Sequence, residues 1–388
     1  MAFPVQSGAV RPPTRLRSAC VPVQGRQGTQ QGARLAQGLS RDARLGLITV
    51  SPALVFAVLL LAVPLFTIVL FSFWTQNFLE IDRTFTLANY AEALTDPLYR
   101  ALMMRSLRIA ASVTAVTVVL AFPIAYYISF HVRPEKKALW LFLITIPFWT
   151  SYLIRIFLWR VILAYDGPVN GTLVELGIID EPLSFILYNA NSVIITLAHA
   201  FAPFAILPIF VSLEKIDRSF LEAAKDLGEG TAMTFLRVTL PLAMPGVLAA
   251  VLIVFIPTVG DYVTPRLVGG SGGTMIANMI YVQIFDLSNR PMGATLAVVA
   301  MATVTITLAW AILHVRFWVY LSDRVGGGLP GLALVAVAAA IDIGVLWWLW
   351  HYGPALFGPA GSLGIMAAIM GGGAILIALL LPKGRWGI

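Results

Sequence analysis

Residues 47–74 read LITVSPALVFAVLLLAVPLFTIVLFSFW and carry no charged side chain. A helix needs about 20 mainly apolar residues to cross the ~30 Å hydrocarbon core of a bilayer. This stretch is long enough to cross it once. It predicts a transmembrane helix, and the same pattern recurs along most of the chain.

The composition of the whole chain agrees with a membrane location. Of its 388 residues, 59% are hydrophobic and 12% are charged, and the mean hydropathy is +0.86. Soluble domains carry about 45–50% apolar and about 25% charged residues. The sequence therefore predicts an all-α integral membrane protein with eight spans. The further apolar segments lie at about 103–130, 138–164, 192–213, 242–260, 294–317, 329–351 and 361–382.

The fifth segment, 242–260, is the least regular of the eight. Pro245, Pro257 and Gly260 interrupt or end it. Prolines are tolerated at membrane depth where neighbouring helices satisfy the freed backbone carbonyls. We expect this span to lie inside the helix bundle.

The distribution of basic residues predicts the orientation of the chain. Residues 1–46 are rich in Arg, Gln, Gly and Pro and hold no long apolar run, which indicates a disordered basic tail and not a secretory signal. If this tail is cytoplasmic, the segments on its side of the membrane hold 18 of the 26 Lys and Arg residues. Lys and Arg are retained on the cytoplasmic side. Both termini are therefore expected to be cytoplasmic.

The sequence lacks the residues that a disulfide, a metal site or a phosphate-binding loop requires. Cys20 is the only cysteine, and the four histidines are scattered without metal-ligand spacing. The glycine-rich segment 269–274 lacks the Gly-Lys-Ser/Thr of a phosphate-binding loop, as does every other segment. We expect no catalytic residues, no metal and no cofactor. The net charge of +7 follows the membrane topology and does not indicate nucleic-acid binding.

The loop between spans four and five, 214–241, differs from the other loops. Ser219 and Glu222 have the spacing of a capping box, which predicts a helix start at Ser219. Ala223 and Ala224 are small and favour helix, which allows a partner surface to approach closely. Gly228 suits the position that ends a helix.

A second short helix is expected to begin near Thr231 and to end at Pro241. The resulting helix–Gly–helix element carries charges of both signs and exposes apolar side chains at Phe220, Leu221 and Leu227. These side chains need a surface to pack against. The residues alone favour equally the chain's own transmembrane helices and the groove of a second protein.

This loop resembles the E-A-A-x3-G-x9-I-x-L-P motif of permease subunits of bacterial ABC importers. Val238 replaces the isoleucine, and the remaining fixed positions match at Glu222, Ala223, Ala224, Gly228, Leu240 and Pro241. The resemblance implies that the loop is the coupling helix that docks on an ATPase subunit. Glu222 has the alternative role of a helix cap only.

A second stretch, 260–270 (GDYVTPRLVGG), is similar to the end of span five in spermidine/putrescine-type permeases. Segments 151–155 with Trp159, and 291–294, resemble the same group. The similarity covers about 45–320 and implies a type I importer permease core of about six spans in a bacterial inner (plasma) membrane. It implies four kinds of partner: a cytoplasmic ABC ATPase dimer, a second permease subunit, a periplasmic or extracellular solute-binding protein, and the membrane.

The predicted organisation has three parts. Residues 1–46 form the tail, 47–320 form the transmembrane permease domain, and 321–388 form a two-helix membrane extension that departs from the six-span pattern. Asp342 lies alone in the seventh span. In a secondary transporter driven by an ion gradient, which is the rival interpretation, it would be the first candidate for a proton site.

Four residues are candidates for the translocation path: Arg155, Asp261, Tyr262 and Thr264. A charged guanidinium in hydrocarbon normally faces a partner or a wet cavity, although Arg155 and Arg160 could instead extend towards the interface. Asp261 could attract a cation or cap a re-entrant turn before Thr264. The resemblance favours a polyamine as the solute, and another small organic solute is the alternative.

Overall fold

The computed structural model describes residues 41–78 and 80–324. Of these, the residues up to Pro64 belong to one unit and the residues from Leu65 belong to a second, which holds the helix bundle. The long helices are α2 (Arg41–Phe71), α4 (Pro97–Phe130), α8 (Ala190–Glu214), α11 (Leu240–Gly260) and α14 (Arg290–Arg324). The shorter helices are α3 (Ala88–Thr95), α5 (Pro134–Thr145), η1 (Ile146–Trp149), α6 (Tyr152–Ile162), α7 (Pro168–Glu175), η2 (Ser184–Ile186), α9 (Arg218–Asp226), α10 (Thr231–Thr234), η3 (Phe235–Thr239), η4 (Pro265–Gly269), α12 (Gly270–Gly273), α13 (Ile276–Tyr281) and η5 (Val282–Asp286).

Five helices in the described ranges are long and apolar enough to cross a membrane, and the number rises to six when one bent helix pair is counted as a span. This confirms the predicted core of about six spans. The expected spans at 329–351 and 361–382, with Asp342, lie outside the described residues, and so does most of the expected tail. Helix α2 covers Arg41–Phe71 of the described residues, and its membrane-spanning part, Ile48–Phe71, agrees with the expected first span at 47–74.

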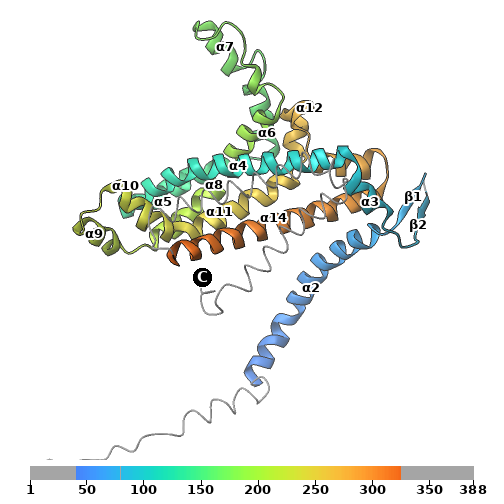
Figure 1. The fold of residues 1–388 in the computed structure, drawn as a ribbon, viewed down its shortest axis with the longest axis horizontal. Coiled ribbons are helices and arrows are strands. Elements are labelled where there is room, and N and C mark those ends of the chain that lie inside the picture. Colours follow the sequence, from blue (N-terminus) through green and yellow to red (C-terminus); the bar gives the residue numbers. More distant parts are fainter. Residues whose placement is uncertain (1–40, 79, 325–388) are drawn as a thin grey trace, which may run out of the picture. The chain divides into compact units, whose positions relative to one another are not determined.

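The centre of the bundle is formed by α4, α8 and α11, which lie side by side (Figure 1). Many of the buried residues where they meet are small, which lets helix backbones approach closely in a membrane. The buried side chains include Val113, Ala121, Ala125 and Ile128 of α4, Val193, Leu197, Ala205 and Ile209 of α8, and Ala243, Ala250 and Val254 of α11. The irregular fifth span therefore lies inside the bundle, as its prolines predicted.

A second apolar cluster joins the other end of α4 to α14. Tyr99 and Leu102 of α4 are buried together with Ile276 of α13 and with Met292 and Leu296 of α14. Helix α3 packs against α14 in the same region. This end of α4 lies opposite the end that carries α9 and α10 (Figure 1).

The third span is not the continuous helix expected over 138–164. Helices α5 and α6 meet at an angle of 85°. Pro147 lies in the η1 turn that ends α5, and Thr150 and Ser151 then adopt extended backbone conformations. Proline has no backbone N–H to donate to the preceding turn of a helix. The helix therefore ends near Pro147 and the chain turns.

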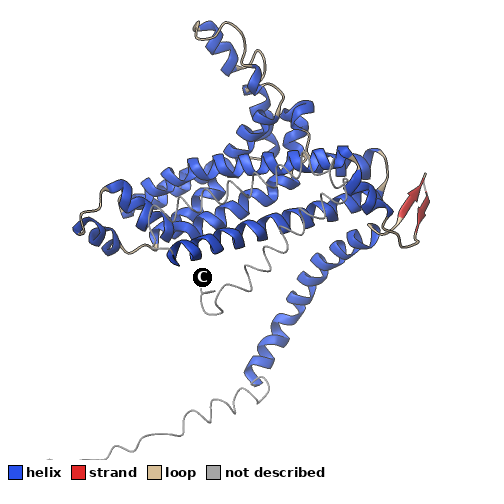
Figure 2. Ribbon diagram, in the orientation of Figure 1, coloured by secondary structure: helices blue, strands red, loops and turns tan. Residues whose placement is uncertain are grey.

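The described part of the chain also holds one feature that no helical pattern predicts. Strands β1 (Thr75–Asn77) and β2 (Glu80–Asp82) form a short antiparallel hairpin after α2, with Thr75 opposite Asp82 (Figure 2). Five of its six strand residues are polar, Ile81 is the exception, and all six are half-buried or exposed. The hairpin is too short for hydrophobic periodicity to show it.

Gly246 marks a close approach of α11 to α8. A Cβ atom placed there would lie 2.5 Å from the carbonyl oxygen of Pro208 and 2.5 Å from the Cβ of Ser212. We expect Gly246→Ala to lower the stability of the bundle by about 1–3 kcal/mol, because overpacking outweighs the higher helix propensity of alanine. Thermal unfolding of the detergent-solubilised protein measures the effect.

The matched control is Gly260→Ala on the same helix, where an added Cβ would meet no atom within 4 Å. This variant should unfold at the wild-type temperature or slightly above it. Equal behaviour of the two variants would show that α8 and α11 do not pack as closely as described.

Candidate functional site

Helix α9 begins at Arg218 with Asp217 as its N-cap, and not at Ser219 as the capping-box spacing predicted. The Asp217 carboxylate accepts a hydrogen bond from the backbone N–H of Ser219 at 2.9 Å. This bond lowers the pKa of the exposed carboxyl below its usual value. Aspartate is among the preferred N-cap residues, and it precedes Ser219 by two positions. The Ser219–Glu222 capping box is therefore wrong, and Glu222 is not a cap.

The end of α9 follows the prediction from Gly228. This glycine has a φ of +85°, a conformation that other residues adopt only with strain. The N–H of Gly228 donates to the carbonyl of Lys225 at 2.9 Å, and the N–H of Glu229 donates to the carbonyl of Ala224 at 3.0 Å. This is the paired arrangement that closes a helix at a left-handed glycine.

Three of the six matched motif positions are exposed on α9 and the glycine turn that follows it. Glu222, Ala223 and Gly228 are exposed. Phe220 and Leu227 are 56% and 84% exposed, so neither side chain is covered by the described part of the chain's own bundle. Ala224, by contrast, is buried within the chain. Of the two alanines, only Ala223 is therefore open to a partner.

The second helix of the loop begins at Thr231, as expected, but it does not end at Pro241. It continues through the π-helical turn η3 into α11, so that Thr231–Gly260 forms one span. Within η3 the N–H of Leu240 donates to the carbonyl of Phe235, five residues earlier. The wider turn ends next to Pro241, the second residue of α11, which has no N–H to donate to the preceding turn. Leu240 is half-buried and Pro241 is exposed.

Two of the four residues predicted for the translocation path meet at Tyr152. The Tyr152 hydroxyl donates to Asp261 Oδ2 at 2.8 Å and lies 2.9 Å from Thr264 Oγ1. Asp261 Oδ1 also accepts the backbone N–H of Val263 at 2.9 Å. Asp261 therefore caps the turn that leads to Thr264, which was one of its two predicted roles. The sequence analysis did not single out Tyr152, because a tyrosine in an apolar helix gives no distinct signal.

Arg155 is 9% exposed and lies one turn after Tyr152 on α6. Its guanidinium carbon is 5.8 Å from the centre of the Tyr152 ring. Its Nε and Nη1 atoms are buried and have no hydrogen-bond partner among the described residues. Arg155 therefore does not extend to the surface, whereas Arg160 on the same helix is exposed.

Tyr262 belongs to an aromatic stack that the sequence analysis did not foresee. Its ring is stacked on that of Tyr281, with the two ring centres 5.3 Å apart. The ring centres of Tyr281 and Phe285 are 4.9 Å apart. The guanidinium carbon of Arg266 lies 4.9 Å from the centre of the Tyr281 ring. The faces of aromatic rings attract cations, so this stack already binds one positive group. The only sequence signal for this stack is the four-residue spacing of Tyr281 and Phe285, which places the two rings on one face of a helix.

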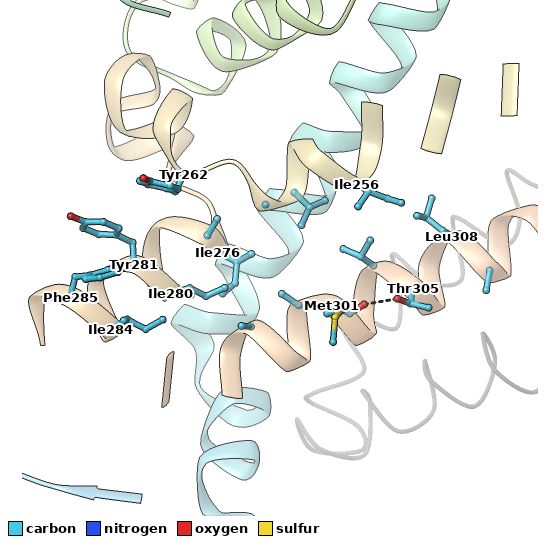
Figure 3. Close-up of a pocket in the computed structure, with 17 residues that line it drawn as sticks. Ile256, Tyr262, Ile276, Ile280, Tyr281, Ile284, Phe285, Met301, Thr305 and Leu308 are labelled. Atoms are coloured by element: carbon cyan, nitrogen blue, oxygen red, sulfur yellow. Dashed lines mark hydrogen bonds between the residues drawn. The ribbon is translucent and has the colours of Figure 1, made fainter. Parts of the chain in front are cut away.

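The stack stands at one end of an apolar cavity of about 750 Å³ between α11, α13 and α14 (Figure 3). Aliphatic side chains form most of the remaining wall. They include Ile256, Ile276, Ile280, Met301 and Leu308. Within the described ranges, no group of three or more His, Cys, Asp or Glu side chains could hold a metal ion.

We expect Tyr152→Phe to loosen the turn at 261–264, because it removes the hydroxyl that Asp261 and Thr264 share. A lost hydrogen bond to a part-buried carboxylate costs about 1–2 kcal/mol, which corresponds to roughly 5–30-fold faster local exchange. Hydrogen exchange of the 261–264 amides measures this.

The control is Tyr262→Phe, which keeps the stacked ring and removes a hydroxyl that bonds to none of the described residues. Its 261–264 amides should exchange as in the wild type. Unchanged exchange in Tyr152→Phe would mean that the Asp261 cap alone holds the turn.

The known proteins that resemble this chain are membrane components of transport systems. Residues 44–324 match the model of the family described as "Binding-protein-dependent transport system inner membrane component". The chain is 37% identical over 239 residues to the spermidine/putrescine transport system permease protein PotB of Salmonella typhimurium (strain SL1344), covering 61% of this chain and 80% of that protein. PotB of Escherichia coli (strain K12) is 36% identical over 238 residues, covering 61% of this chain and 83% of that protein.

The inner membrane ABC transporter permease protein YdcU of Escherichia coli (strain K12) is 33% identical over 244 residues, covering 60% of this chain and 77% of that protein. Among solved structures, a bacterial ABC transporter involved in the import of the acidic polysaccharide alginate superposes with a TM-score of 0.53 at 15% identity. The match covers 76% of this chain and 99% of the other. At this identity the likeness shows the fold alone.

Proposed function

The chain belongs to the family of inner membrane components of binding-protein-dependent transport systems, and from this membership we propose that it is the permease subunit of an ATP-driven importer of polyamines. The observation that carries the proposal is the loop at 214–241. It matches the importer motif at all but one position and presents Glu222, Ala223 and Gly228 on an exposed helix–Gly–helix element. Glu222, Ala223, Gly228 and Pro241 then form the contact with an ATPase, while Ala224 and Leu240 shape the loop from within.

ATP hydrolysis takes place on a separate subunit, because this sequence holds no phosphate-binding loop. The partners are a cytoplasmic ATPase dimer, a second permease subunit and a periplasmic or extracellular solute-binding protein. The loop lies on the cytoplasmic side together with both termini, in keeping with the distribution of Lys and Arg.

Transport follows from this assembly by alternating access. ATP binding closes the ATPase dimer and moves the α9 helices of the two permeases. The cavity between the permeases then opens outward, and hydrolysis returns it to the inward-facing state. A ligand shifts such an equilibrium only by its differential affinity for the two states, so ATP must bind the closed dimer more tightly.

The aromatic stack of Tyr262, Tyr281 and Phe285 supports a cationic solute. It lies on the proposed outer side of α11, and a cationic solute would reach these ring faces by displacing the Arg266 guanidinium, which lies against Tyr281. PotB proteins are named for spermidine and putrescine, and both are polyamines that carry positive charge. Tyr262 is the member of this stack that we place in the translocation path, with Arg155, Asp261 and Thr264 shaping its wall.

A secondary transporter driven by an ion gradient is the alternative from a different class. It would need paired broken helices and buried acids at the midplane. The described residues contain one bent span, and Asp342 lies outside them. Within the importer class, the alternative is another small organic solute.

We expect Ala223→Arg to release the ATPase subunit from the complex, because it places a long charged side chain on the exposed surface of α9 where the two proteins meet. Co-purification of the ATPase with the tagged permease measures this, and at least a tenfold loss is expected for a contact worth about 1.4 kcal/mol. Ala91→Arg, at an exposed position of α3, is the matched control and should retain the ATPase. Full retention by Ala223→Arg would place the ATPase contact elsewhere.

The solute is tested with the complete complex in sealed vesicles. Uptake of labelled spermidine should require ATP and the binding protein and should persist when a protonophore collapses the ion gradient. Collapse of uptake by the protonophore would favour the secondary transporter. ATP-dependent uptake of another solute without spermidine uptake would change the substrate and leave the class intact.

A further inference from the structure

The loop at 214–241 is attached at its beginning to the end of α4. Glu214, the last residue of α8, accepts two hydrogen bonds at Oε1, one from Ser129 Oγ at 2.7 Å and one from Lys137 Nζ at 2.6 Å. The Lys137 side chain is 13% exposed and that of Glu214 is 36% exposed. The bonds therefore connect α8 to α4 and to the start of α5 at a place from which water is partly excluded.

The first residue of α9 reinforces this attachment. The Arg218 guanidinium carbon lies 5.9 Å from the centre of the Phe130 ring, and its Nη2 donates to the carbonyl of Ser129 at 3.4 Å. Ser129 is buried. Because Arg218 belongs to α9, the coupling helix itself contacts the last turn of α4.

The loop returns to the same helix at its other end. Phe235, the first residue of η3, packs edge-on against two rings of α4. Its ring centre lies 5.5 Å from that of Phe122 and 6.0 Å from that of Tyr126. Phe122 and Tyr126 are one turn apart on α4, and Ser129 follows in the next turn. The last turns of α4 therefore hold both ends of the loop.

The opposite part of α4 holds the segment 265–286, which carries Tyr281 and Phe285 of the aromatic stack. Ser106 Oγ accepts the buried backbone N–H of Ile276 at 2.8 Å, and Arg105 Nη1 donates to the carbonyl of Ser271 at 2.9 Å. Gln283 Nε2 donates to the Tyr99 hydroxyl at 2.9 Å. These contacts come from α12, α13 and η5.

We propose that α4 carries the movement of the coupling loop to the segment at 265–286, and that Glu214 and Phe235 are the positioning residues that join the loop to it. The inference rests on the proposed function. Ser106 and Ser129 are 23 residues apart, so the helix spans about 35 Å between the two sets of contacts. Coupling over such a distance needs an element that both sites bias, and α4 is bonded to both. Pro123 interrupts the hydrogen bonds within α4 between the two sites, and packing against α8 and α11 supports the helix there.

A rival route exists through the covalent chain. The loop continues directly into α8 and α11, and α8 also contacts η4 and α12. If movement passes through these helices, the side-chain contacts with α4 are dispensable. Variants that break only those contacts distinguish the two routes.

The test uses the complete transporter in vesicles and measures labelled spermidine uptake per ATP hydrolysed. Lys137→Ala, Glu214→Ala and Phe235→Ala should retain the ATPase subunit and continue to hydrolyse ATP. Their uptake per ATP should fall at least about fivefold, the lower end of typical coupling between two sites. Lys136→Ala is the matched control, because Lys136 is the exposed neighbour of Lys137 and makes no side-chain bond among the described residues.

Two further variants separate positioning from mere folding. The exchange Lys137→Glu with Glu214→Lys restores an ion pair of reversed polarity, and Phe235→Tyr keeps the ring. Both should recover most of the uptake per ATP. If uptake per ATP is unchanged in the alanine variants, the proposal is wrong and the movement passes through α8 and α11 instead.

Release of the ATPase by the alanine variants would also overturn the proposal, since the residues would then support docking and not transmission. Failure of the charge exchange to restore the ratio would show that the Lys137–Glu214 contact is not what positions the loop. If the wild-type complex retains no ATPase and imports no solute, the proposed function itself fails.

Discussion

Within hydrocarbon, every backbone N–H and C=O group must find its partner inside the protein, and the rest of this structure depends on that constraint. It makes the membrane-embedded chain helical, and it restricts where helices can end. At four of the described helix or turn starts a polar side chain supplies an acceptor to the free backbone N–H groups, whereas α5, α6 and α7 begin without one. Asp96 does so for α4, Asn189 for α8, Asp217 for α9 and Asp261 for the turn before η4.

The same constraint shapes the contacts between helices. Lipid tails are as apolar as leucine, so hydrophobic burial does not drive helices together, and close packing must do so. Alanines and Gly246 let α4, α8 and α11 approach closely, and Gly246 has no room for a Cβ atom. Helix α4 contains Pro123, which removes one hydrogen bond within the helix, and packing against α8 and α11 on two sides supports it across that point. Transmission between the two ends of α4 requires this support.

Much of the architecture could be predicted from the sequence because it follows from composition and spacing. The spans come from apolar runs, and the end of α9 comes from Gly228, whose left-handed backbone only glycine adopts easily. The start of α9 could not be fixed, since Asp217 and Ser219 are both good caps and only the folded chain selects between them. The bend between α5 and α6 and the meeting of Tyr152 with Asp261 depend on tertiary contacts, which sequence periodicity does not encode.

Ala223 and Ala224 show why adjacent residues of one motif can have different roles. On a helix, neighbouring side chains point about 100° apart, so two adjacent small residues face different surroundings. Ala224 is buried within the chain, and a larger residue there would push α9 away from its own support. Ala223 is exposed beside Phe220, so a larger residue there would leave the fold intact and obstruct only an incoming protein. One alanine therefore sets the distance between α9 and its own bundle, and the other sets the distance to the proposed ATPase. A coupling helix needs both distances to be short if movement of the ATPase is to reach the bundle without loss.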